Sequence, residues 1–166
     1  TSRLLCVAGS VPVKASGPEY RLATTGCTDP YDLSGGAGVS GTLSGVAHLL
    51  SPNERDCYRG ARRLLSYLPS NSGEPPPHRP TTDDPERADV ELQSIIPASP
   101  NLPYDMRDVV MRVLDNREFL EGQPFFAGNI VVGLGRLNGH VVGGVGNQPK
   151  VLPGAIEIDA AGTSGR

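Results

Sequence analysis

The segment 129–150, NIVVGLGRLNGHVVGGVGNQPK, limits the possible folds of this chain more than any other. Two glycine-rich apolar runs flank the pair Asn138-Gly139. Asn-Gly between such runs is the strongest short-range hairpin signal, because a type I′ turn needs positive φ at both central residues. The segment therefore predicts a strand, a tight turn and a second strand. Both runs are apolar on both faces, which favours a sheet that is covered on both sides.

The glycines of this hairpin partly match a dinucleotide fingerprint, with Gly133-x-Gly135 followed by Gly139. The third glycine falls one position late, and the next element is expected to be a strand where the fingerprint requires a helix. We therefore reject a nucleotide site. Glycine in a packed strand instead permits close backbone approach, either to a neighbouring strand or to a ligand. For Gly143 we favour packing alone.

The order Gly-Asn-Gln-Pro at 146–149, directly after the hairpin, resembles the C-terminal domain of biotin-dependent acyl-CoA carboxyltransferases. These are the β subunits of propionyl-CoA and acetyl-CoA carboxylases. Further segments agree with that family in order and spacing: LLSYLPSN at 64–71, PYDMRDV at 103–109, GGA at 35–37 and SGVAH at 44–48. The resemblance covers most of residues 1–161, and the ordered matches together are specific where each alone is weak.

The resemblance implies an α/β, crotonase-like fold of the ClpP/crotonase superfamily, with the chain at the junction of two domains. Residues 1–68 would be the C-terminal part of the N-terminal carboxyltransferase domain. Residues 69–103 would be a Pro-rich acidic interdomain connector, and residues 104–166 would start the C-terminal carboxyltransferase domain. These subunits are usually about three times longer, so the chain resembles the middle of one.

The function implied by the resemblance is transfer of CO2 from carboxybiotin to the α-carbon of an acyl-CoA, propionyl-CoA or acetyl-CoA. Biotin would be carried on a separate carrier protein, the partner would be a biotin carboxylase/biotin carrier subunit, and the complete subunit would form a homo-oligomer, a hexamer. Such enzymes stabilise enolate-like oxygens with paired backbone amides and need no side-chain nucleophile. Both oxyanion turns are expected outside the 166 residues, so we assign no catalytic residue and expect the isolated chain to be inactive.

For acyl-CoA or biotin binding the prediction is the hairpin exit, Gly146, Asn147 and Gln148, with weaker support for Gly133 and Gly135. The carboxamides of Asn147 and Gln148 can offer paired donors and acceptors to an amide or a ureido ring. An equally weighted alternative is that both residues only cap the end of the strand through backbone hydrogen bonds.

Composition excludes several other functions. A net charge of −3 gives no electrostatic reason for nucleic acid or an anionic membrane as partner. No apolar run approaches the roughly 20 residues that span a bilayer, and no signal peptide is recognisable. Cys6, Cys27 and Cys57 are widely spaced and indicate buried or incidental thiols in a reducing compartment, with no metal site. A cytoplasmic location is the expectation.

The three histidines carry no triad. We expect His78 and His140 to be exposed. For His48 we favour a hydrogen-bonded packing role over that of a catalytic base.

A capping box, Ser51-Pro52-Asn53-Glu54, predicts a helix over 52–68. Its apolar stripe is formed by Tyr58, Ala61, Leu65 and Leu68, with Cys57 and Leu64 beside them. Its exposed face carries Arg55, Arg59, Arg62 and Arg63. We take this face as solvated, with a CoA phosphate or a partner subunit as the alternative contact.

Nine of the sixteen prolines fall within 69–103, too polar a segment to fold alone. We expect an ordered wrap over a domain surface, pinned by Leu92, Ile95 and Ile96. Further elements follow: a helix over 105–115, a short strand over 118–121, and a strand over 151–158.

Two alternatives to an enzyme segment stay open. The chain could be a non-catalytic assembly or docking module that keeps the subunit contacts of this family. It could also be a decayed gene fragment without a stable fold, because each half is near the lower size limit for an independent core.

Overall fold

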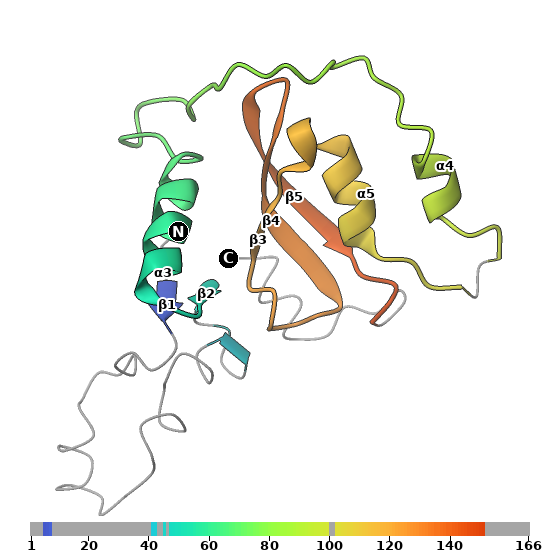
Figure 1. Ribbon diagram of the computed structural model, residues 1–166, viewed down its shortest axis with the longest axis horizontal. Helices are drawn as coiled ribbons and strands as arrows, with labels where there is room; N and C mark the ends of the chain where they lie inside the picture. The colour runs from blue at the N-terminus through green and yellow to red at the C-terminus, as the bar shows by residue number, and fades with distance from the viewer. Residues whose placement is uncertain (1–4, 8–40, 43–44, 46, 100–101, 152–166) are drawn as a thin grey trace, which may run out of the picture. The chain divides into compact units, whose positions relative to one another are not determined.

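The structure, a computed structural model, describes residues 5–7, 41–42, 45, 47–99 and 102–151. The chain divides into two units, Thr1–Ala61 and Arg62–Arg166, and each is described here by itself. In the first unit β1 (Leu5–Val7) pairs in parallel with β2 (Leu49–Ser51), with Leu5 opposite Leu49. The helix α3 (Glu54–Leu65) follows β2 directly (Figure 1). Its last four residues belong to the second unit.

Helix α3 begins with a cap that differs from the predicted one. The Asn53 side-chain oxygen accepts the Asp56 amide at 2.9 Å, and the Asn53 side-chain nitrogen donates to Asp56 at 2.8 Å. The helix begins at Glu54 with Asn53 as its cap, so the predicted capping box, with Ser51 as the cap, is wrong by two residues. Asp56 accepts from the Asn53 side chain, whereas the matching residue of a capping box accepts from the backbone amide of the cap.

The predicted apolar stripe of α3 is not its packed face. Tyr58 is 66% exposed and Leu65 is 65% exposed, whereas Leu64 and Tyr67 are buried. The helix ends at Leu65, three residues before the predicted end, and a turn closed by the Leu68 amide on the Leu65 carbonyl follows. This turn brings the Tyr67 ring inward, so the packing residues are one position away from the predicted stripe.

The second unit is built on a three-stranded antiparallel sheet in the order β3-β4-β5. The strands are β3 (Leu120–Gly122), β4 (Ile130–Leu137) and β5 (His140–Asn147). Asn138 and Gly139 connect the last two with φ values of 49° and 78°, and Leu137 pairs with His140. The predicted hairpin and its turn are confirmed. The predicted strand over 118–121 lies slightly later, and the predicted strand over 151–158 falls almost entirely outside the described residues.

Helix α5 (Met106–Val113) covers one face of this sheet, as Figure 1 shows, and confirms the predicted helix over 105–115. A single 3-10 turn, η1 (Asp115–Arg117), connects it toward β3. The opposite face is open along β5, where Val145 is 63% exposed and Gly143 is exposed. The expectation of a sheet covered on both sides is therefore wrong for β5 within the described residues.

The segment 69–99 wraps over the second unit with one short helix, α4 (Leu92–Ile95). Its contacts are polar. The Arg79 amide donates to the Gly139 carbonyl at 3.0 Å, and the Arg87 guanidinium donates to the Leu114 carbonyl at 3.1 Å. Of the predicted apolar pins, Leu92 and Ile95 are half-buried, whereas Ile96 is 55% exposed. The domain boundaries at 68 and 103 stay a prediction.

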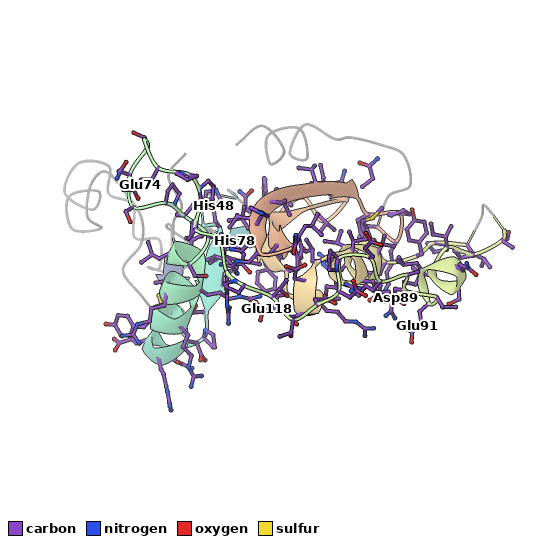
Figure 2. All side chains as sticks on the ribbon, turned by 90° about the horizontal axis from the view of Figure 1, so that it is seen from above. His48, Glu74, His78, Asp89, Glu91 and Glu118 are labelled. Carbon is purple, nitrogen blue, oxygen red and sulfur yellow. The ribbon has the colours of Figure 1, made fainter. Side chains whose placement is uncertain are left out.

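Ion pairs attach the second half of this segment to α5. Arg112 lies 2.6 Å from Glu91 and 3.7 Å from Asp89, and Arg117 lies 3.5 Å from Asp89. Figure 2 shows Asp89 and Glu91 close together beside α4.

Within the described residues, no helix is both long enough and apolar enough to cross a bilayer.

We predict that Gly133→Ala destabilises the second unit by about 1–3 kcal/mol. A Cβ at Gly133 would overlap the Leu120 carbonyl and the Phe119 ring. Gly143→Ala is the matched control in the paired strand, because a Cβ there meets nothing within 4 Å, and its effect should stay within about 0.5 kcal/mol. Urea unfolding followed by circular dichroism measures both. Equal losses from the two substitutions would contradict this account of the packing.

Candidate functional site at the hairpin exit

The exit of β5 is held by the side chain of Gln148, which is fully buried. Its nitrogen Nε2 donates to Asp105 Oδ1 at 2.6 Å, and its oxygen Oε1 accepts the Met106 amide at 3.0 Å. Its backbone amide donates to the Asn129 carbonyl at 2.9 Å. Gln148 thus joins the end of β5, the first turn of α5 and the start of β4. Both ends of its carboxamide are used inside the protein.

Asp105 is the N-cap of α5 and the centre of this polar cluster. It accepts the Arg107 amide at 3.0 Å, and Lys150 lies 3.6 Å from its other oxygen. Burial alone would raise the pKa of Asp105, but the hydrogen bonds from Gln148 and the Arg107 amide, with the charges of Arg107 and Lys150, hold that pKa below its ordinary value. The cluster therefore favours the ionised carboxylate, as the N-terminus of a helix does.

Arg107 extends the cluster to β3 through a bidentate pair with Glu121. Nη2 lies 2.6 Å from Glu121 Oε1, and Nε lies 2.9 Å from Oε2. The hydrogen bonds from this pair are the main reason that the pKa of Arg107 is raised. A fork of this kind fixes the orientation of both side chains.

The predicted site residues do not come together on one surface. Gly133, Gly135 and Gly146 share the sheet face under α5, where added Cβ atoms would meet Phe119, Leu114 and Met106 respectively. Asn147 is exposed on the opposite face, paired with Ile130. The three glycines thus have a packing role and Gln148 has a capping role, which leaves Asn147 with an accessible polar side chain. Ligand binding by these residues stays a prediction.

The other end of the hairpin is fixed by Asp115, which was missed in the sequence. This carboxylate is 8% exposed, and its two oxygens accept the Asn138 amide at 2.9 Å and the Gly139 amide at 2.7 Å. His78 and His140 are exposed as predicted, but their rings lie 4.6 Å apart and His78 Nε2 lies 3.2 Å from the Asn138 carbonyl. The connector therefore touches the turn directly.

A second residue missed in the sequence is Arg136, which is 6% exposed. Its guanidinium lies 4.1 Å from the centre of the Tyr67 ring and donates to the Ser66 carbonyl at 2.6 Å. Carbonyls at a helix C-terminus and the face of an aromatic ring both stabilise a cation. Arg136 therefore ties the residues after α3 to β4.

Pockets of about 200 and 420 Å³ lie among the described residues on the connector side of the hairpin turn. Both contain Asp115, whose oxygens are already hydrogen-bonded, and neither contains a predicted site residue. Among the described residues no group of three metal-ligating side chains occurs. His48 is buried, in keeping with a packing residue.

We predict that the stability gained from the Asp105 charge is lost in acid. A carboxylate with a lowered folded pKa contributes stability above its ordinary value of 3.8 and loses it as the pH falls through the folded pKa. Asp105→Asn keeps the cap but removes the charge, so the variant should be less stable than the wild type at pH 6, and this difference should narrow as the pH falls below 3.8. Urea unfolding midpoints of both proteins across this pH range measure the difference in stability. A difference that does not narrow in acid would contradict the stabilising role of the Asp105 charge.

Comparisons with known proteins all point to the same family. The chain matches the carboxyl transferase domain over residues 1–164. It is 46% identical to the propionyl-CoA carboxylase carboxyltransferase subunit of Haloferax mediterranei, over 88% of this chain and 28% of that protein. It is 43% identical to the methylmalonyl-CoA decarboxylase subunit alpha of Veillonella parvula, over 91% of this chain and 30% of that protein.

A solved structure agrees in fold. The transcarboxylase 12S structure with methylmalonyl-CoA and methylmalonic acid bound superposes with a TM-score of 0.88 at 30% identity, over 97% of this chain and 31% of that one. The predicted α/β, crotonase-like fold is confirmed. The chain spans about three tenths of the length of these relatives. It therefore belongs to the carboxyl transferase domain family of enzymes and corresponds to a part of the full-length subunits in that family.

Proposed function

We propose that this protein acts in the carboxyltransferase step of an acyl-CoA carboxylase, moving CO2 from carboxybiotin to the α-carbon of propionyl-CoA or acetyl-CoA. The observation that carries the proposal is the match to the carboxyl transferase domain over residues 1–164, together with the superposition on a transcarboxylase that holds methylmalonyl-CoA. Identities of 43% and 46% to acyl-CoA enzymes support the same substrate class.

The proposal includes the partners. Biotin would arrive on a separate carrier protein, supplied by a biotin carboxylase/biotin carrier subunit, and the full-length subunit would assemble as a homo-hexamer. The hexamer assembly named for the transcarboxylase 12S structure supports the last point. A cytoplasmic location fits the free thiol of Cys57.

In this proposal the role of the chain is to bind the ligand and to orient it. A mechanism that depends on backbone amides requires no side-chain nucleophile from this chain. At the hairpin exit we place the ligand contact on Asn147, whose carboxamide is exposed, with Gly146 beside it in the strand. Gly133, Gly135 and Gln148 would support this contact from inside the fold.

A chimera tests the proposal. The matching segment of the Haloferax mediterranei subunit, 146 residues at 46% identity, is replaced by the corresponding residues of this chain. We expect the chimera, with its biotin-carrying partner, to carboxylate propionyl-CoA within about 100-fold of the parent rate, a loss of about 2.7 kcal/mol. Incorporation of labelled bicarbonate into acid-stable product measures the rate.

The isolated chain and the parent subunit lacking this segment serve as negative controls. Activity of the 166 residues alone would contradict an enzyme segment that needs the rest of the subunit. A chimera that folds and assembles without activity would instead favour a docking module and overturn the proposed function.

A further inference from the structure

The Gln148 side chain is hydrogen-bonded inside the protein, unlike the exposed side chain of its neighbour Asn147. A carboxamide offers one acceptor oxygen and two N–H donors. In Gln148 the oxygen takes the Met106 amide, the nitrogen donates to Asp105, and the side chain is 0% exposed. A ligand cannot reach these atoms without opening the N-terminus of α5. Any effect of Gln148 on ligand binding would therefore act through its neighbour Asn147.

The backbone on both sides of the Asn147 side chain is fixed. Asn147 pairs with Ile130 in the sheet, and the next amide, that of Gln148, donates to the Asn129 carbonyl at 2.9 Å. The Gln148 side chain then anchors this strand end to Asp105, which Arg107 ties on to Glu121 of β3. The direction of Asn147 is therefore set by a cluster that reaches three elements of the second unit.

We propose that Gln148 is a positioning residue, which locks the exit of β5 onto α5 and so orients the Asn147 carboxamide toward an amide or urea group of the ligand. This inference rests on the proposed function. The pantetheine amides of an acyl-CoA and the ureido ring of biotin share the required chemistry, a C=O beside an N–H. A polar contact held in place before the ligand arrives costs less ordering entropy on binding, so loss of the lock should weaken binding.

Gln148→Glu is the informative substitution in the chimera. It keeps the shape of the side chain and the acceptor for Met106, but sets a second carboxylate against Asp105, where the present contact is 2.6 Å. Two carboxylates this close cannot both ionise without repulsion, and a shared proton restores the hydrogen bond as the pH falls. We expect the KM to rise about tenfold at pH 8, a cost of about 1.4 kcal/mol, with kcat within about twofold. At pH 6 the KM ratio to wild type should fall below about threefold.

The two possible ligand groups give different readouts. A KM change for propionyl-CoA alone assigns the contact to the pantetheine amides, and a change for the biotin carrier alone assigns it to the ureido ring. Gln93→Glu, the same change at an exposed position of α4, is the matched control and should leave both KM values unchanged. If Gln148→Glu does not fold, Gln148→Met is tested instead. We expect the same rise in KM, without recovery at pH 6, because Met has no group that can be protonated.

Asn147→Ala decides whether Gln148 acts through its neighbour. In that background Gln148→Glu should add less than about twofold to the KM, because the group that it orients is gone. A folded Gln148→Glu variant with unchanged KM values at both pH values would overturn the positioning role, as would a full additional loss in the Asn147→Ala background. An inactive wild-type chimera would overturn the proposed function instead, so the two failures are distinct.

Discussion

The register of the β4–β5 hairpin depends on one buried carboxylate. Asp115 accepts the two consecutive amides of the turn, those of Asn138 and Gly139, and so holds both residues at positive φ. A slip of one residue would move every side chain of the hairpin to the other face. Gly133 and Gly135 would then leave the positions where only hydrogen fits against Phe119 and Leu114. The packing of α5 on the sheet therefore depends on the contact between Asp115 and the hairpin turn, at the far end of the strands.

The two ends of the hairpin are secured by the same device, a carboxylate that accepts backbone amides, but with different consequences. At the turn the acceptor comes from η1 and binds the hairpin directly. At the exit Asp105 binds its own helix, and Gln148 passes that constraint to the strand. Asp105 lies 3.6 Å from Lys150 and has a lowered pKa, so the stability of the exit responds to charge and pH.

Sequence reasoning succeeded where the information is local. The Asn138-Gly139 turn, the hairpin and helix α5 follow from conformational preferences and periodicity within a few residues. It failed where the decisive contact is distant. Arg136 and Ser66 are 70 positions apart, and Asp115 and Asn138 are 23 apart, so no pattern in the sequence links them. Gln148 was predicted as a ligand contact because its amide chemistry suits one. The sequence did not show that both ends of this amide are hydrogen-bonded at the N-terminus of α5, and the ligand contact stays a prediction. The error in α3 has a related cause, because the stripe through Tyr58 and Leu65 fits helical spacing, but the turn at Tyr67 decides which face is buried.

The connector shows why a polar segment can be ordered without a core of its own. Its proline content lowers the entropy of the unfolded chain, so fewer favourable contacts suffice to hold it. Those contacts are charged or backbone groups: Asp83 accepts the Asn116 amide at 2.8 Å and pairs with Arg87 at 2.7 Å. The Asn116 amide first, and Arg87 next, hold the pKa of Asp83 below its ordinary value. Because Arg87 also donates to the Leu114 carbonyl, directly before Asp115, the connector and the carboxylate that fixes the hairpin turn share one local network. The segment that looked like a spacer in the sequence is thus part of what sets the hairpin in place.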